Sequence, residues 1–356
     1  MELPLARAAL QRGLDEGLHY GAQLAVIFRG EAASVCVGEA SEGRPLAEDA
    51  VLCWSSSVKP LMAIALGLLQ ERGRLSFEDP VAKHLPAFGK EGKADITLRH
   101  CLTHTAGLFA STMEGQPRLR EDAPPDEVLR HICDQPTAEG WQLGRRCAYD
   151  SPAWYVMSGV ATAADPEHRA YEKFVQEEIF SPLGMSSCSI GMQPERRARL
   201  ESSDLLAPLY LRGPKAPPWR VLPEEKNRRK VEYPCPAGNG RGPAKELAAL
   251  YASLLPGAPG PLLQPETVRQ ITAVAREGIY DELQGVDTPW SLGFAVNCIL
   301  SGRHASPNAF GHGGSQSSWA FADPEHGLAV CCLCNGKPGP DLHYKRVGAV
   351  STAVYE

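Results

Sequence analysis

A serine and a lysine stand three residues apart in the tetrad Ser56-Ser57-Val58-Lys59, where a helix is expected to begin. Side chains at positions i and i+3 lie on one face of a helix, so the Lys59 amine can reach the Ser56 hydroxyl. A serine hydroxyl becomes an effective nucleophile when a neighbouring base takes its proton, and a lysine can be that base only if burial or nearby positive charge lowers its pKa. The tetrad therefore fits nucleophilic catalysis, but it also fits an N-cap serine followed by a lysine whose amine extends to solvent.

The flanking segments predict how this tetrad is positioned. Residues 50–54 form an apolar run typical of a buried strand, and residues 60–69 form a nearly all-apolar helical segment that ends at Gly73. A helix that is apolar on every side is a buried helix. The polar groups at its inner end then need partners inside the protein, because an unpaired buried polar group is costly.

Two later segments could supply such partners. Tyr149 and Ser151 stand at Y-x-S spacing before an apolar helix, and His312-Gly313-Gly314 follows Phe310-Gly311 ahead of a predicted strand. Glycines at that place would let a substrate backbone lie against the strand edge.

The three segments together resemble the motifs of the serine β-lactamase and penicillin-binding protein superfamily, specifically its class C β-lactamase, esterase and transacylase branch. That superfamily carries S-x-x-K, then Y-x-N or S-D-N, then K-T-G. This chain has Ser56-Ser57-Val58-Lys59, Tyr149-Asp150-Ser151 and His312-Gly313-Gly314 in the same order.

The connecting segments 73–86 and 96–108 are also similar to that branch, and the resemblance extends over residues 20–340. Within the second segment, His104 is interpreted as a structural residue that holds a loop through side-chain hydrogen bonds. The resemblance implies an α/β (α+β) fold of the β-lactamase-like type, in which an antiparallel sheet is flanked by helices and carries a mostly helical inserted domain.

Hydrophobic patterns indicate strands at both ends of the chain with helices between them. The strand patterns cover residues 23–28, 33–37, 290–296, 319–322 and 327–333. The helical patterns cover residues 4–17, 166–190, 243–255 and 343–354, and residues 194–243 are expected to be mostly loops. We therefore expect residues 1–52 and 286–356 to form the sheet domain, residues 53–285 to form the helical domain with the nucleophile, and the active site to lie between the two domains.

The resemblance implies a role for each catalytic residue. Ser56 would be the acylated nucleophile and Lys59 its proton partner. Tyr149 would move the proton between Ser56 and the leaving group, and His312 would replace the lysine of the third motif and keep Tyr149 ready to accept a proton. The backbone N–H groups of Ser56 and Ser315 would form the oxyanion hole, which stabilises the developing negative charge.

The predicted substrate-binding residues are Ser151, Gly313, Gly314 and Trp319. Ser151 stands where the family usually has asparagine, so an amide that would bind the substrate is missing. His312 in place of lysine holds a substrate carboxylate less firmly, because imidazole is neutral or half charged near neutral pH. We therefore expect at most slow acylation by penicillins.

Composition limits the classes of partner. The 356-residue chain has 43% hydrophobic and 22% charged residues and a formal net charge of −6, which argues against nucleic acid or an anionic membrane as a partner. No apolar stretch approaches the ~20 residues that cross a bilayer, and the N-terminus lacks the apolar core of a signal peptide. The eleven cysteines are odd in number and irregularly spaced, so we expect free thiols and a cytoplasmic protein.

No cofactor and no metal site are predicted. A strand would divide the thiols of the Cys331 to Cys334 cluster between its two faces, and no second C-x-x-C pair accompanies them. The expected partner is a small-molecule ester or amide, with an amine or alcohol as acyl acceptor if the group is transferred. No pattern in the sequence indicates an oligomeric state.

The expected function is that of a cytoplasmic serine esterase or amidase that works through an acyl-enzyme. Three alternatives stay open: a transacylase that moves an acyl group to an amine or alcohol in natural-product or antibiotic biosynthesis, a D-aminopeptidase-like enzyme or weak β-lactamase, and a non-catalytic sensor that is acylated and not released. Turnover of p-nitrophenyl esters without an acceptor favours the esterase, turnover that needs an amine favours the transacylase, and a stable adduct favours the sensor.

Overall fold

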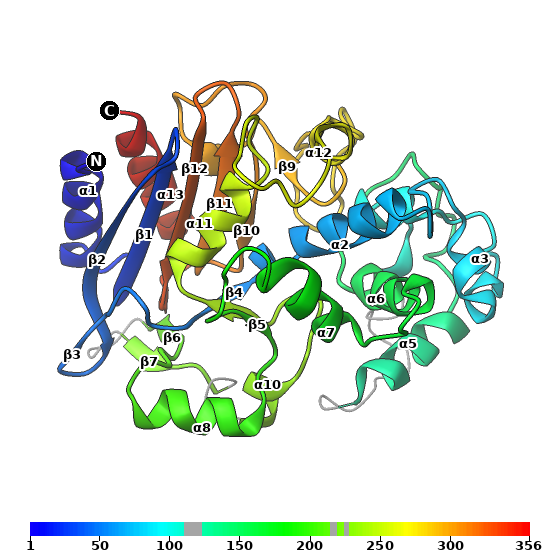
Figure 1. The fold of residues 1–356 in the computed structure, drawn as a ribbon, viewed down its shortest axis with the longest axis horizontal. Helices are drawn as coiled ribbons and strands as arrows, with labels where there is room; N and C mark the ends of the chain where they lie inside the picture. The colour runs from blue at the N-terminus through cyan, green and yellow to red at the C-terminus, as the bar shows by residue number, and fades with distance from the viewer. Residues whose placement is uncertain (110–122, 214–218, 224–227) are drawn as a thin grey trace.

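Strands from both ends of the chain form a seven-stranded antiparallel sheet in the computed structural model, which describes residues 1–109, 123–213, 219–223 and 228–356. The strand order is β3-β2-β1-β12-β11-β10-β9, so the N-terminal hairpin pairs directly with the C-terminal strands (Figure 1). The strands are β1 (Gly21–Phe28), β2 (Glu31–Ser41), β3 (Arg44–Pro45), β9 (Ala295–Val296), β10 (Phe310–Gly314), β11 (Ser318–Asp323) and β12 (Leu328–Cys334). The predicted assembly of the sheet from both ends is confirmed.

Helices cover both faces of this sheet. α1 (Pro4–Asp15) and α13 (Pro340–Tyr355) pack together on one face, and α11 (Ala244–Ala252) packs against β1, β11 and β12 on the other (Figure 1). Because side chains alternate across each strand, the sheet separates two apolar clusters. Cys331 lies in the cluster on the α11 side, whereas Cys332 lies in the cluster beneath α1 and α13.

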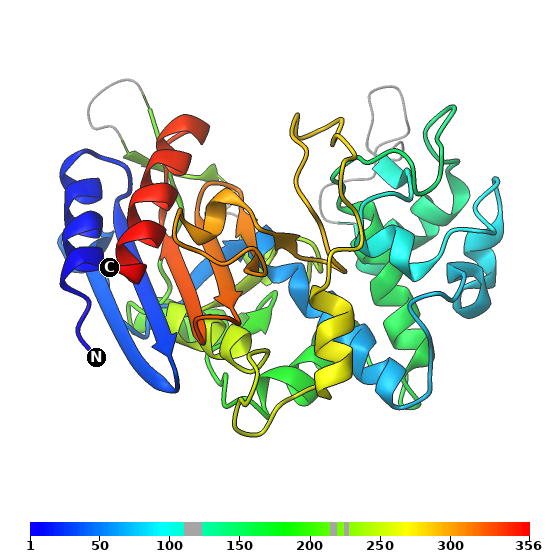
Figure 2. The same cartoon turned by 90° about the horizontal axis from the view of Figure 1, so that it is seen from above.

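The chain between the two groups of strands forms further helices, and α2 to α6 lie to one side of the sheet (Figure 2). These helices are α2 (Pro60–Glu71), α3 (Val81–His84), α4 (Leu98–Leu102), α5 (Pro125–Asp134), α6 (Pro152–Ala164), α7 (Tyr171–Val175), α8 (Pro194–Ser202), α10 (Arg228–Glu232) and α12 (Pro265–Thr272). Three 3₁₀ turns, η1 (Ser56–Val58), η2 (Pro86–Gly89) and η5 (Ile299–Ser301), and one π-helical turn, Gln176–Phe180, complete the helical elements described. The division into two domains stays a prediction.

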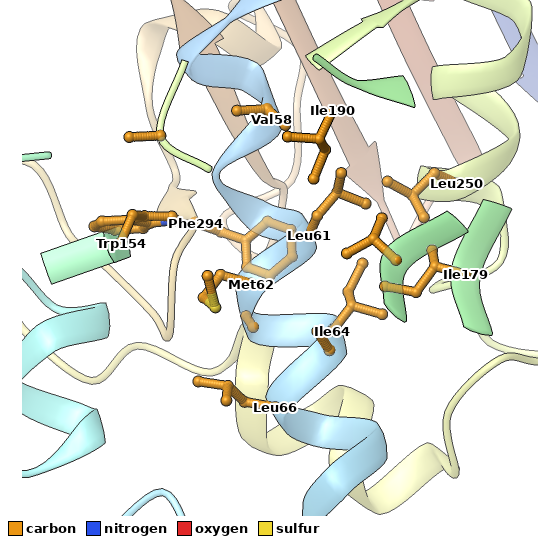
Figure 3. Packing of buried hydrophobic residues seen from close by; sticks show 14 of the residues in the cluster. Val58, Leu61, Met62, Ile64, Leu66, Trp154, Ile179, Ile190, Leu250 and Phe294 are labelled. Carbon is orange, nitrogen blue, oxygen red and sulfur yellow. The ribbon is translucent and has the colours of Figure 1, made fainter. Parts of the chain in front are cut away.

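The helix α2 is buried along its length and fixes the direction of the turn that precedes it. Its residues from Pro60 to Leu69 are all buried. Ile64 faces the side of Ile179, whereas Met62 faces the side of Trp154 (Figure 3). The predicted helix that is apolar on every side is therefore confirmed, and its apolar contacts hold η1 at the edge of the sheet.

Two small three-stranded sheets complete the fold. The first consists of β4 (Leu52–Ser55), β8 (Gly240–Gly242) and β5 (Ser189–Ile190), and the second of β13 (Gly336–Lys337), β6 (Tyr210–Arg212) and β7 (Trp219–Val221). The first sheet matters for the site, because η1 and α2 continue directly from β4.

Two sequence predictions of secondary structure are wrong. Residues 194–243 were expected to be mostly loops, yet α8, β6, β7, α10 and β8 form there, and the buried Arg197 of α8 pairs with Glu232 of α10 (2.7 Å). Residues 290–296 were expected to be a strand, but only Ala295–Val296 pair as β9. The preceding residues turn, because the Ser291 N–H donates to Phe294 O (2.9 Å) and Gly293 has a φ of +89°.

Candidate active site

The tetrad begins at the point where β4 ends and turns inward. Ser55, the last residue of β4, has a φ of +49°, and the 3₁₀ turn η1 follows and leads into α2. Within residues 50–69, Ser56 has the only side chain that is not buried. The local fold therefore presents one hydroxyl, that of Ser56, outside an otherwise buried segment.

The two neighbouring serines fix this turn against the β10–β11 hairpin. Ser55 Oγ lies 3.1 Å from Ser317 Oγ, and Ser57 Oγ lies 2.8 Å from Ser318 Oγ. The Ser57 hydroxyl also lies within hydrogen-bond distance of the main-chain oxygen of His312 (3.1 Å). These contacts hold the start of α2 and the end of β10 side by side, which brings the first and third predicted motifs together.

The Lys59 side chain is completely buried and its amine reaches Ser56. Lys59 Nζ donates hydrogen bonds to Ser56 Oγ (3.3 Å) and to the carbonyl oxygen of Ala237 (2.7 Å). It lies 4.9 Å from the centroid of the Tyr149 ring and 5.3 Å from that of Trp154. Aromatic faces attract a cation electrostatically, so these two rings and the carbonyl group together orient the amine toward Ser56.

The Tyr149 ring is surrounded by other rings. Its centroid lies 4.5 Å from that of His104, 6.0 Å from that of His312 and 6.2 Å from that of Trp290. Its backbone N–H donates to Oδ1 of Asp281 (3.1 Å). The second motif therefore joins Ser56, Lys59 and His312 in one place, as the sequence predicted.

The His312 imidazole is uncharged at neutral pH. Burial, followed by the nearby charge of Lys59, lowers the pKa of His312 to about 3. Nδ1 donates a hydrogen bond to the carbonyl oxygen of Gly313 (2.6 Å), which leaves Nε2 as an acceptor, and Nε2 has no partner among the described residues. His312 can therefore accept a hydrogen bond from a hydroxyl group, but it adds no positive charge to the site.

A carboxyl group lies buried beside the same rings. The Asp150 backbone N–H donates to Nδ1 of His104 (3.1 Å), while neither carboxyl oxygen has a hydrogen-bond partner within the described part of the chain. Burial raises the pKa of Asp150 to about 7, and burial also lowers the pKa of His104 far below its usual range. His104 therefore holds the Tyr149 segment through a neutral ring, in agreement with its structural interpretation.

The turn after β10 carries the second candidate oxyanion donor. Ser315 and Gln316 both have positive φ angles, +32° and +59°, as the chain reverses into β11. Lys337 Nζ donates to Ser315 Oγ (3.2 Å) from β13. The serine pairs described above hold this turn against η1, so the backbone of Ser315 and the backbone of Ser56 belong to facing segments.

Comparison with known proteins agrees with this geometry. The family model described as Beta-lactamase matches residues 6–353. The chain belongs to the beta-lactamase family. Within this family, Esterase EstB of Burkholderia gladioli is 30% identical over 342 residues, which cover 84% of this chain and 81% of EstB. Acyltransferase calJ of Penicillium decumbens is 27% identical over 259 residues, which cover 64% of this chain and 57% of calJ.

A solved structure shows the same fold. A penicillin-binding protein homolog from Caulobacter crescentus superposes with a TM-score of 0.83 at 23% identity, over 99% of this chain and 96% of that protein. The β-lactamase-like fold predicted from the motifs is confirmed, and this family member is a serine hydrolase or acyltransferase. In the parts of the chain that the structure describes, no helix is both long and apolar enough to cross a membrane.

The structure corrects one predicted substrate-binding residue of this beta-lactamase family member and shows how two others are packed. Trp319 is completely buried in the cluster beneath α1 and α13, and its Nε1 donates to Ser351 Oγ (2.9 Å). It lies one residue out of phase with the face of the sheet that carries the site, so its prediction as a pocket residue is wrong.

A side chain at Gly313 would contact Leu300 (3.3 Å), and one at Gly314 would overlap the main-chain oxygen of Trp54. Gly314 is therefore needed for close packing of the protein itself, whereas Gly313 faces only a flexible side chain, and substrate binding by the two glycines stays a prediction. Ser151, in contrast, is exposed at the start of α6, two residues after Tyr149.

Sequence reasoning missed three groups that complete the site of this family member. Ala237 contributes a backbone carbonyl, which no residue type signals. Asp281 acts on Tyr149 from more than a hundred residues away in the chain. Trp154, which follows the second motif, packs its ring against the Lys59 amine, and its Nε1 donates to Lys59 O (3.0 Å).

Proposed function

We propose that this chain is a serine-dependent acyl-enzyme catalyst that hydrolyses a small ester or amide. The observation that carries the proposal is the buried Lys59 amine, 3.3 Å from the Ser56 hydroxyl and directly over the Tyr149 ring. A nucleophile within hydrogen-bond reach of a base, with further groups that orient the base, is the arrangement that covalent catalysis needs.

The proposed reaction moves one proton in a circuit. Ser56 Oγ attacks the substrate carbonyl carbon while its proton passes to the unprotonated form of the Lys59 amine. Tyr149 gives its phenol proton to the leaving alcohol or amine and takes the proton from Lys59 in exchange, and the acyl group remains on Ser56. In the second half-reaction, water attacks the acyl ester and gives a proton to Lys59 through Tyr149, and Lys59 returns that proton to Ser56 Oγ as the acid leaves.

Two further groups assist this circuit. A neutral His312 can accept a hydrogen bond from the Tyr149 hydroxyl at Nε2, which would hold the phenol in place before it passes its proton to the leaving group. The backbone N–H groups of Ser56 and Ser315 would bind the oxyanion of the tetrahedral intermediate, since donors fixed in advance on developing charge contribute strongly to catalysis.

The same features argue against efficient β-lactam hydrolysis. The neutral His312 lacks the positive charge of a third-motif lysine, and Ser151 cannot offer the amide of asparagine. We infer at most slow acylation by penicillins. We also assign the chain to the cytoplasm, because all eleven cysteines are unpaired and free thiols persist best in a reducing compartment.

A second candidate function is acyl transfer to an amine or alcohol, as in a biosynthetic pathway. Its support is the similarity to Acyltransferase calJ over 64% of this chain. The first half-reaction is the same, and the two functions differ only in whether water or an acceptor takes the acyl group from Ser56.

One experiment tests the proposal and separates the two functions. The protein is incubated with p-nitrophenyl esters, with and without amine acceptors, and its intact mass is measured during turnover. We expect turnover without an acceptor and a transient acyl adduct that Ser56→Ala cannot form. Turnover that requires the amine would indicate a transacylase, a stable adduct would indicate a sensor, and full activity of Ser56→Ala would overturn the assignment.

A further inference from the structure

A segment far along the chain, residues 276–290, lies against the second motif. Asp281 forms a β-bridge with Cys147, and the Glu282 N–H donates to Cys147 O (2.9 Å). At the other end of the segment, Trp290 Nε1 donates to Leu102 O (3.1 Å) and the Trp290 ring lies edge-on to the Tyr149 ring. Asp281, near the start of the segment, and Trp290, at its end, therefore both contact the region around Tyr149.

The Asp281 carboxylate is the polar centre of this contact. It is 3% exposed, and its Oδ1 accepts hydrogen bonds from the backbone N–H groups of Tyr149 (3.1 Å), Leu283 (3.0 Å) and Gln284 (2.9 Å). Its Oδ2 accepts a hydrogen bond from the Cys147 thiol (3.3 Å). One oxygen atom thus joins the backbone of Tyr149 to the turn that begins at Asp281.

Packing of the outward side chains does not hold this turn. Tyr280 is 60% exposed, Leu283 58% and Val286 45%. Apolar side chains with so much exposed area gain little free energy from burial, so they do little to hold the turn in place. Polar contacts attach the tip of the segment instead: Arg146 donates two hydrogen bonds to the Glu282 carboxylate (both 2.7 Å), and Asp281 accepts from the Tyr149 N–H. Of these contacts, only that of Asp281 reaches Tyr149 itself.

The backbone of Asp150, the next residue of the motif, is also held by a side chain from another part of the chain, that of His104. The Tyr149 N–H is bound by Asp281 and the Asp150 N–H by His104, so side chains from two different loops fix two successive backbone groups. The surrounding rings limit rotation of the Tyr149 side chain. Fixing the two backbone N–H groups therefore also limits the distance of the Tyr149 ring from Lys59.

We propose that Asp281 is the positioning residue for Tyr149: its Oδ1 holds the tyrosine backbone so that the phenol stays in line between Ser56 and the leaving group. This inference rests on the proposed role of Tyr149 in proton transfer. A displacement of about 1 Å in a reacting group is enough to slow catalysis on the order of a hundredfold, so the loss of this one contact has a large effect on kcat.

The test uses three variants of the full-length protein and p-nitrophenyl esters. Asp281→Ser keeps a hydroxyl that can accept from the N–H groups two and three residues further on, but it is too short to reach Tyr149. We expect its kcat to fall on the order of 30- to 100-fold while KM changes less than about threefold. Asp281→Asn keeps an oxygen at the Oδ1 position, so we expect it to regain kcat to within about fivefold of the wild type.

Cys147→Ala is the matched control. It removes the thiol contacts to Oδ2 and to the Arg276 guanidinium and leaves the Tyr149 contact intact, so its kcat should stay within about threefold of the wild type. Each kcat is expressed per folded molecule, as measured by near-UV circular dichroism, so that partial unfolding of Asp281→Ser does not imitate a catalytic loss.

A fourth variant separates this inference from the proposed function. If Tyr149→Phe retains wild-type turnover, the proposed proton path is wrong. If Tyr149→Phe is inactive, the inference about Asp281 is overturned by any of three results: a kcat of Asp281→Ser close to the wild type, an equal loss in Asp281→Asn, or an equal loss in Cys147→Ala.

Discussion

Three successive serines have three different partners, and this division supports the proposal that Ser56 is the reactive one. Ser55 and Ser57 bind hydroxyl groups of the β10–β11 hairpin, whereas Ser56 contacts the Lys59 amine and stays partly exposed. A hydroxyl with a buried structural partner is not free to attack a substrate. The geometry thus supports Ser56 as the nucleophile from contacts alone.

The buried carboxyl of Asp150 makes stability depend on pH. Its pKa is raised from 3.8 to about 7 by burial, so between these values the unfolded chain is ionised and the folded chain still binds the proton. The free energy of unfolding therefore falls as pH rises from 4 to 7, by about 4 kcal/mol at most. Asp150→Asn cannot ionise, so we expect urea unfolding to show it more stable than the wild type at pH 8 and not at pH 4. An equal difference at both pH values would contradict this.

The neutral His312 leads to a prediction about the pH profile of activity. Since its pKa is lowered to about 3, His312 gains its proton only far below neutral pH. His312→Phe keeps a ring but removes the Nε2 acceptor, so it should lower kcat/KM by about 10- to 100-fold, yet the midpoint of any acid limb between pH 5 and 8 should not move. Ester hydrolysis measured over that range checks both parts, and a shifted midpoint in the variant would show that His312 titrates there.

At the scale of elements, the close approach of β10 to β4 depends on Gly314. The Trp54 carbonyl, at the end of β4, accepts a hydrogen bond from Ser318 Oγ (2.5 Å) and occupies the space where a Gly314 side chain would lie. We expect Gly314→Ala to destabilise the fold by about 2 kcal/mol or more, because backbone must shift. Gly313→Ala meets only the flexible Leu300 side chain and should cost less than about 1 kcal/mol. Thermal unfolding of the two variants compares them, and equal losses would contradict the argument.

The same elements indicate what can be predicted from sequence. The meeting of Ser56, Lys59, Tyr149 and His312 in one place could be predicted, because each motif combines a reactive residue type with the start or end of a regular element. The side-chain direction of Trp319 could not be predicted, because it depends on the register of β11 with β12, and a shift of one residue exchanges the two faces of a strand. The contact of Asp281 with Tyr149 could not be predicted either, because its partner is a backbone N–H that only the fold brings close.

At the scale of the whole molecule, one side chain joins both ends of the chain to the site. Arg346 of α13 is buried and donates hydrogen bonds to the main-chain oxygens of Leu18, Gly336 and Gln316. Gln316 belongs to the turn that follows β10, next to the candidate oxyanion donor Ser315. The sheet assembled from the two ends thus also supports the position of that turn.

The thiols provide a prediction for the whole molecule. All eleven cysteines are free, and only Cys36, Cys235 and Cys298 are partly exposed. Burial raises the pKa of Cys36 and of Cys298 to about 11, which leaves little reactive thiolate at pH 8. We expect a thiol reagent to titrate eleven groups in guanidinium without reductant, but at most three in the native protein, and only slowly. Reductant should leave Tm unchanged, because no disulfide contributes to stability. Fewer than eleven thiols in the unreduced, denatured protein would mean that the chain forms disulfides, and the assignment to a reducing compartment would then lose its basis.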